Sequence, residues 1–555
     1  MSHINGKSRN QIMMPSSIEE YVEENNPVRV IDAFVDTLDM KALGFVKATP
    51  AYTGRPAYAP GDLLKLYIYG YMYKIRSSRR LMTECRRNME VMFLLNELRP
   101  DFRTISDFRK DNPEPIREVF REFVRFCCKH GLYKKELVAI DGTKVRAQNA
   151  DDKCYNREIL VKKIARIDAH IEEYIGALKR NDESGEDGDD EEDGRRKPPE
   201  EIHEALNELY ERREKYDGYL GRIRAKTMTQ ILETDPEAHR MRTRNGFHCC
   251  YNVQVATDTN SHLICEYETT SNTNDMGQLA NLATKAKETL SAPRLSVVAD
   301  KGYDSQSDVL HTLMQGIFPN VPVRSGKEER IFNIDYRNVD VTDEMKNSTK
   351  PKDIRKCLSA GIIPICLENE SLSIEVQTGG GVVACFKRID EKHVKCPMNK
   401  VLPRTRRRNG NQSIFASQAA CRNCINRCTA SSNHKTVCFV DGVDYVPAYM
   451  FGKSKTFNVM PEKAFCEQHN RALHGRQKPR KVVIKVKYDE EMSRKRMCAV
   501  EHPFGSVKWY GDAGYVLCRG KRKVSAELGL SFLGYNIKRA IKMVGAEELI
   551  RKLGE

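Results

Sequence analysis

The sequence predicts a mixed α/β protein of several domains, and three observations support this. Apolar, strand-like residues 137–140 end on Asp141, and a second such run, residues 295–299, ends on Asp300. Between the two runs the apolar pattern indicates strand, strand and helix. A chain of 555 residues also exceeds one hydrophobic core, so about two to four domains are expected.

The chain is basic, with 92 Lys and Arg against 77 Asp and Glu and a net charge of +15. This excess favours a nucleic-acid partner, although charge that only aids solubility is the alternative. Residues 1–14 are polar and no apolar run approaches the roughly 18 residues of a membrane helix, so we expect a cytoplasmic protein without a membrane partner. In a reducing compartment its 18 cysteines would stay free or bind metal.

Residues 1–130 are expected to form a helical domain that binds DNA. Phe102, Ile105 and Phe108 recur at every third position and predict one packed helix face, with arginines on another. Residues 74–80 add a basic segment. A helical packing domain with a solvated charged face is equally compatible with these residues.

Residues 131–310 are expected to hold the first part of a catalytic core. A buried strand can hold a carboxylate rigidly at its end, so Asp141 and Asp300 are candidate metal ligands, although Asp before Gly is also common turn chemistry. Strands are expected at residues 251–256 and 263–267 and a helix at 276–290, with Asp275 as the capping residue of that helix.

Residues 155–230 interrupt this core with a pattern typical of a coiled-coil hairpin. Apolar residues recur at steps of four and three over 164–178 and again over 206–223, which predicts two packed helices. Residues 182–193 between them are too acidic to bury and are expected to form a solvated tip.

Residues 311–490 are too many for a loop and are expected to form an inserted domain. A tetrahedral structural zinc site is predicted there from Cys396, Cys421, Cys424 and Cys428. Free thiols are the alternative, and nearby Cys385 and Cys438 leave the ligand choice open. A basic patch that faces phosphates is expected from the arginines Arg406, Arg407 and Arg408.

Residues 491–555 supply a further carboxylate. Glu501 and Lys508 are seven positions apart and would project from the same side of a continuous helix, which requires Pro503 to lie in its first turn. A helix with a surface ion pair is the alternative.

Several motifs together resemble the bacterial insertion-sequence transposases of the DDE, RNase H-like superfamily. The matching segments are residues 58–60, 70–71, 77–79, 99–109, 141–143, 246–254, 299–303, 396–428 and 500–508. The resemblance implies an RNase H-like core with a helical N-terminal module and a Cys-rich insertion. It implies catalytic Asp141, Asp300 and Glu501, with Glu527 as a competing third carboxylate, and phosphate contacts from Arg496 and Lys508.

Three carboxylates without His or Cys neighbours suit Mg²⁺ or Mn²⁺, and two such ions would support in-line displacement at phosphorus. The resemblance implies cleavage at transposon ends and strand transfer into target DNA by a homodimer, within the nucleoid. The alternatives are a nuclease of the same fold that does not join strands, and a domesticated DNA-binding protein that has lost an acidic ligand.

Overall fold

The computed structural model describes residues 17–50, 52, 56–183, 199–225, 229–378, 382–396, 399–408, 412–422, 424, 433–441, 445–449 and 480–555. The chain divides into two compact units. The first comprises Met1–Leu313, Ile317–Arg324 and Asp489–Glu555, and the second comprises Met314–Gly316 and Ser325–Tyr488. The second unit therefore interrupts the first in sequence.

Short helices make up the N-terminal part of the first unit. They are η1 (Ile18–Tyr21), α1 (Pro27–Asp36), α2 (Pro60–Met72), α3 (Ser78–Arg87), α4 (Met89–Leu94), α5 (Phe102–Asp111) and α6 (Pro113–Lys129). Helices α1, α2 and α6 each begin with proline, whose missing N–H costs nothing in a first turn. Helix α2 is buried on nearly every side and contacts α1, α4 and α5.

A mixed sheet forms the centre of the first unit. Its strands are β1 (Leu137–Arg146), β4 (His239–Thr243), β5 (Gly246–Asp258), β6 (Ile264–Thr270), β7 (Leu295–Val298) and β8 (Ile317–Asn320). They lie in the order β4-β5-β1-β7-β8, and β6 pairs with β5. Strand β1 is antiparallel to β5 and parallel to β7, which is parallel to β8. Contrary to expectation, β1 does not end at Asp141, because β5 pairs with it as far as Arg146.

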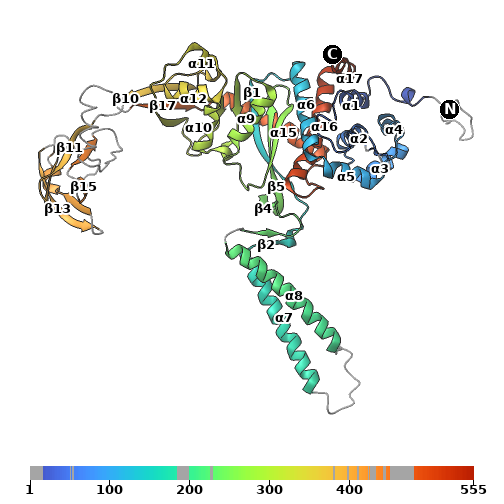
Figure 1. The fold of residues 1–555 in the computed structure, drawn as a ribbon, viewed down its shortest axis with the longest axis horizontal. Helices are drawn as coiled ribbons and strands as arrows, with labels where there is room; N and C mark the ends of the chain where they lie inside the picture. Colours follow the sequence, from blue (N-terminus) through green and yellow to red (C-terminus); the bar gives the residue numbers. More distant parts are fainter. Residues whose placement is uncertain are drawn as a thin grey trace, which may run out of the picture. The chain divides into compact units, whose positions relative to one another are not determined.

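Further helices of the first unit follow later in the chain. They are α9 (Leu279–Leu290), α10 (Gln306–Met314), α15 (Glu490–Gly505), α16 (Lys521–Val544) and α17 (Ala546–Leu553), with the short turn η3 (Lys301–Tyr303) and the π-helical turn η5 (Ser506–Tyr510). Helix α9 contacts β5 and β6, and α15 contacts β1 and β7 (Figure 1). Helix α16 packs against α2 and α6, so the last helices of the chain join the N-terminal helices to the sheet.

Two long helices leave the sheet between β1 and β4. Helices α7 (Arg157–Glu183) and α8 (Pro199–Arg224) run side by side (Figure 1). In sequence they lie between two short paired strands, β2 (Cys154–Tyr155) and β3 (Ile231–Leu232). Ile171, Ile202 and Leu206 form one apolar cluster between them, and Arg213 pairs with Asp168 at 2.6 Å. The two helices predicted from the apolar repeat are therefore confirmed.

The second unit is mainly antiparallel sheet. One sheet has the order β10 (Leu372–Thr378), β17 (Arg480–Lys487) and β9 (Glu329–Asp335). A second sheet contains β15 (Thr436–Val440), β14 (Gln412–Ala416), β13 (Val401–Arg408), β12 (His393–Lys395), β11 (Val382–Arg388) and β16 (Tyr445–Tyr449), in that order. Helices α11 (Asp343–Asn347), α12 (Pro351–Ser359) and α13 (Gln418–Arg422) complete the unit. Within the described parts of the chain, no helix is long and apolar enough to cross a membrane.

Candidate active site

Asp141 and Asp300 stand at the same level of the central sheet. Strand β7 pairs with β1 in parallel register from Leu137 opposite Ser296 to Ala139 opposite Val298. Two residues further along each chain lie Asp141 and Asp300, and Asp300 keeps an extended backbone with φ −82° and ψ 177°. Because neighbouring strands lie about 4.8 Å apart, this register brings the two aspartates next to each other, at the level where the inner strand β7 ends beside β1. We call this place the sheet edge.

Helix α15 packs on the residues that precede the two aspartates. Its Ala499 and Val500 are buried against Leu137, Ala139 and Val298. Because strand residues two apart share a face, Asp141 projects on the same side of the sheet as Ala139, toward α15. Apolar packing therefore fixes the helix that contains Arg496 and Glu501 beside the strand ends.

Two cations predicted from the sequence reach β1. Arg496 donates from its guanidinium to Asp141 Oδ2 at 3.0 Å, and Lys508 Nζ donates to the backbone oxygen of Lys144 at 2.8 Å. Burial lowers the pKa of Lys508. Both side chains therefore contact β1, and Arg496 contacts the candidate catalytic residue Asp141 itself.

Burial is the main influence on Asp141 and raises its pKa to about 6. The Arg496 guanidinium opposes this rise, whereas the carboxylates of Asp300 and Asp275 add to it. The edge of the sheet thus collects more negative charge than one arginine compensates.

Glu501 is exposed on α15 and forms no ion pair with any residue of the described chain. Its rival Glu527 is fully buried on α16. Glu527 pairs with Arg76 at 2.7 Å and Arg109 at 3.8 Å, and accepts from the backbone N–H groups of Leu517 and Cys518. These partners hold the pKa of Glu527 below its usual value against the opposing effect of burial, and they make it a structural anion.

The expectation that Asp275 caps a helix is wrong. Helix α9 begins after Gln278, and the first N–H groups of α9, on Leu279 and Ala280, donate to the Asp308 carboxylate. Asp275 instead accepts from Asn252 Nδ2 at 2.8 Å and Gln254 Nε2 at 2.7 Å. Sequence reasoning missed these contacts because Asn252 and Gln254 lie on strand β5, far from Asp275 in the sequence.

Pro503 does not lie in a first turn as expected, because α15 begins at Glu490 and Pro503 is near its end. Proline provides no N–H for the carbonyl of Ala499, four residues earlier. The turn η5 then follows, so Glu501 and Lys508 do not belong to one regular α-helix.

The predicted zinc ligands lie in the second unit. Cys396 Sγ accepts from the Lys400 N–H at 3.3 Å, and Cys421 Sγ accepts from the Lys435 N–H at 3.5 Å. Cys428 lies outside the described residues. In the described ranges, no group of three or more His, Cys, Asp or Glu residues is placed to hold a metal ion.

The predicted arginine patch lies on strand β13. Arg406 and Arg407 are exposed, and they pair with successive residues of β14. Successive strand residues project to opposite faces, so these two guanidinium groups do not form a single surface. Arg408 ends the same strand.

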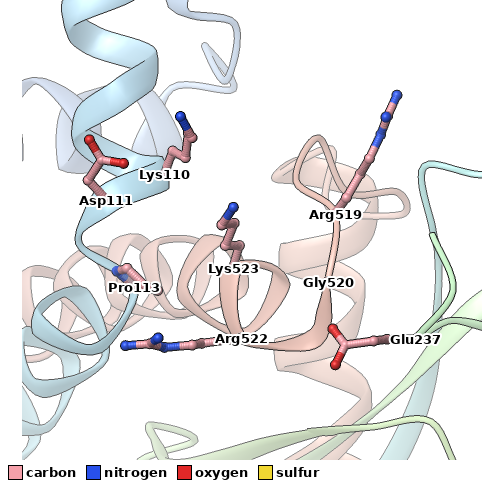
Figure 2. Close-up of a pocket in the computed structure, with 8 residues that line it drawn as sticks. All are labelled: Lys110, Asp111, Pro113, Glu237, Arg519, Gly520, Arg522 and Lys523. Carbon is pink, nitrogen blue, oxygen red and sulfur yellow. The ribbon is translucent and has the colours of Figure 1, made fainter. Parts of the chain in front are cut away.

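A separate cavity of about 340 Å³ lies at the start of α16. Figure 2 shows Lys110 and Asp111 at the end of α5, and Arg522 and Lys523 in the first turn of α16. Arg519 completes the basic lining. Four cations and two carboxylates, from Asp111 and Glu237, make this a cationic concavity.

Comparisons with known families agree with this arrangement. Residues 16–111 match the transposase domain DUF772, and residues 132–537 match the transposase DDE domain. A comparison with curated protein sequences gave no match.

One solved structure, the piggyBac transposase synaptic complex with hairpin DNA, aligns with 95% of this chain and 79% of that chain at 8% identity. Its TM-score of 0.26 is too low to support an argument about the fold. The family match, by contrast, spans most of the chain and contains both aspartates of the shared sheet edge. The chain therefore belongs to the DDE transposase family and is a DNA transposase.

Proposed function

We propose that this transposase cuts DNA at the ends of its element and joins the freed ends to target DNA, with Asp141 and Asp300 at the reacting phosphate. The observation that supports this assignment most strongly is the shared register of the two aspartates at one sheet edge. Glu501, on the helix packed against that edge, is the proposed third acidic residue.

We propose that Asp141 and Asp300 hold a divalent cation at this edge. Asp141 and Asp300 offer hard carboxylate oxygens, and the pKa of Asp141 is raised by burial and then by the neighbouring carboxylates. A cation among them would relieve that repulsion, and oxygen donors without thiolate favour Mg²⁺ or Mn²⁺. When bound, two such ions supply charge stabilisation to the attacking and leaving oxygens of a phosphodiester.

The residues of the chain would act around that centre as follows. Arg496, which contacts Asp141, would bind a DNA phosphate near the scissile bond. Lys508, held at β1 by the Lys144 carbonyl, would contact a neighbouring phosphate. Ala139 and Ile140, which precede Asp141, are buried and would keep bulk water from one side of the reacting phosphate.

Double-stranded DNA, both transposon ends and target, is the proposed partner. The net charge of +15 and the basic lining of the cavity beside α16 support contacts to phosphates. We place the N-terminal helices and Arg406, Arg407 and Arg408 among the DNA contacts. A homodimer would hold the two transposon ends. The protein would act in the cytoplasm, associated with the nucleoid.

A structural zinc ion in the second unit is a separate proposal. Hydrogen bonds from backbone N–H groups to Cys396 and Cys421 would orient and stabilise thiolate ligands. Cys424 and Cys428 would complete the set. Metal analysis of the purified protein tests this: about one zinc per chain, lost in Cys421→Ser, is expected, whereas zinc-free folded protein would contradict it.

A strand-transfer assay tests the catalytic proposal. The substrate is labelled DNA taken from immediately outside the coding sequence, mixed with supercoiled plasmid and Mg²⁺. We expect cleavage and covalent joining to plasmid by the wild type, and neither reaction with Asp300→Asn. Cleavage without joining would instead identify a nuclease of the same fold.

A further inference from the structure

A further cavity of the first unit, of about 250 Å³, lies where the end of α2, the end of α15 with η5, and α16 meet. Four of its lining residues on α16, Ser531, Tyr535, Lys538 and Lys542, recur at steps of four and three. Residues with this spacing lie on one side of a helix, so α16 presents a single face to the cavity. None of the residues proposed for the catalytic centre lines it.

Part of the lining is apolar. Tyr71 and Met72, from the last turn of α2, and Val507 of η5 are each at most 5% exposed. A Cβ at Gly534 of α16 would lie 3.2 Å from Met72 Cγ, so the glycine lets the two helices approach closely here. These residues give the cavity a dry surface for the apolar part of a ligand.

The charged part of the lining is basic. Lys538, Arg539 and Lys542 line the cavity, and no Asp or Glu of the described chain does. Lys538 donates to the backbone oxygen of Met72, and Arg539 Nε donates to that of Ser261 at 2.8 Å. Both side chains keep further N–H groups for a ligand. Lys542 forms no hydrogen bond or ion pair with another described residue.

These charges act on His502 of α15, which also lines the cavity. Its pKa is lowered first by burial, and further by Arg539, by the His262 ring and by Lys542. Nδ1 of the His502 ring lies 2.9 Å from the hydroxyl of Tyr535, which itself donates to the His262 backbone oxygen. An anion in the cavity would relieve the repulsion among these groups.

One buried polar group of the lining has no partner. Ser531 is only 6% exposed, and its hydroxyl forms no hydrogen bond with any described residue. A serine hydroxyl inside a helix often bonds to the carbonyl four residues earlier, and this one does not. Because a buried hydroxyl without a partner is costly, an oxygen of a ligand is the acceptor that the site lacks.

We propose that this cavity binds one organic phosphate of nucleotide size, with the phosphate on the basic residues and Ser531 and the organic part on Tyr71, Met72 and Val507. A phosphate has up to two charges and several acceptor oxygens for three cations and a hydroxyl, whereas a carboxylate has one charge and two oxygens. The volume is below the roughly 300 Å³ at which pockets for drug-sized ligands begin, so the cavity suits a single nucleotide. That nucleotide is either free or part of a DNA strand.

Isothermal titration calorimetry of the full-length protein with thymidine monophosphate tests the proposal. We expect one nucleotide to bind per chain. Ser531→Ala should weaken this binding ~10-fold or more, because it removes a hydrogen bond to a charged oxygen. The same variant should not lower the thermal midpoint of the ligand-free protein, because its hydroxyl has no partner there.

The chain offers a matched control for each substitution. Ser525 is also buried on α16 with an unpartnered hydroxyl but does not line the cavity, so Ser525→Ala should bind the nucleotide like the wild type. Lys542→Ala should weaken binding ~3-fold or more. Lys521→Ala, which removes an exposed lysine of α16 outside the cavity, should not.

Failure of the wild type to bind the nucleotide, or equal affinities in Ser531→Ala and Ser525→Ala, would overturn the inference. Inorganic phosphate should bind more weakly than the nucleotide, and equal affinity would refute the role of the apolar lining. If the ligand is a nucleotide of DNA, Ser531→Ala also weakens binding of terminal DNA. If it is a free nucleotide, DNA binding stays at the wild-type level. The proposed function does not depend on these results, because the cavity contains neither Asp141 nor Asp300.

Discussion

Replacement of Glu527 by alanine should destabilise the contact between the N-terminal helices and α16. Glu527 is fully buried, and Arg76 is only 4% exposed beside it at 2.7 Å. Removal of the carboxylate leaves the guanidinium groups of Arg76 and Arg109 buried without their counter-ion. Breaking a buried pair by removal of one partner costs ~3–5 kcal/mol.

Hydrogen–deuterium exchange of the α16 peptides, followed by mass spectrometry, measures this cost locally. A loss of ~3–5 kcal/mol corresponds to protection that falls ~10²- to ~5 × 10³-fold. Glu548→Ala on α17 is the control, because Glu548 pairs with Arg551 and Lys552 at the protein surface, where ion pairs contribute little to stability. Equal protection of α16 in the two variants would refute the argument. Mn²⁺ affinity should be unchanged in Glu527→Ala, because Glu527 is structural and not a metal ligand.

Three other predictions follow from single side chains. Arg496→Ala should raise Mn²⁺ affinity up to ~5-fold, which corresponds to the ~1 kcal/mol of a partly exposed ion pair. The same variant should cleave DNA more slowly. Unchanged Mn²⁺ affinity would show that the arginine does not compete with metal. Burial lowers the pKa of His502 from 6.5, so the unfolded chain takes up a proton before the folded chain as pH falls below 6.5. The thermal midpoint should therefore drop between pH 7.5 and 5.5, and drop less in His502→Gln; equal drops would contradict this. Gly142→Ala should lower the free energy of unfolding by ~1–3 kcal/mol, because its Cβ meets Asp275. Gly218→Ala is the control: its Cβ has nothing within 4 Å, so it should raise the free energy of unfolding by ~0.5–1 kcal/mol. Similar stabilities of the two variants would contradict the packing of the site.

Local pattern was sufficient for the elements that bear the aspartates. Apolar runs predicted β1 and β7, and the apolar repeat predicted α7 and α8, because strand alternation and helix periodicity are properties of neighbouring residues. The register that brings Asp141 and Asp300 together depends on pairing across more than 150 positions, which the motifs of a known family suggested and composition did not.

Two of the errors involve distant partners. Asp275 has the chemistry of a capping residue, but its contacts are amides on β5, and the cap comes from Asp308. Arg109 was expected on a charged helix face, yet it is buried beside Glu527. The residues adjacent in sequence do not reveal these contacts. A buried ion pair, such as that of Arg109 with Glu527, appears in the sequence as two ordinary charged residues.

The most direct test of the central claim is single-turnover cleavage of terminal DNA by the wild type, Asp141→Asn and Asp300→Asn, with DNA binding measured in parallel. The account predicts that both variants bind the DNA as tightly as the wild type and cleave it at least ~10³-fold more slowly in Mg²⁺. Cleavage at the wild-type rate by either variant would contradict the assignment of the two aspartates as the catalytic centre.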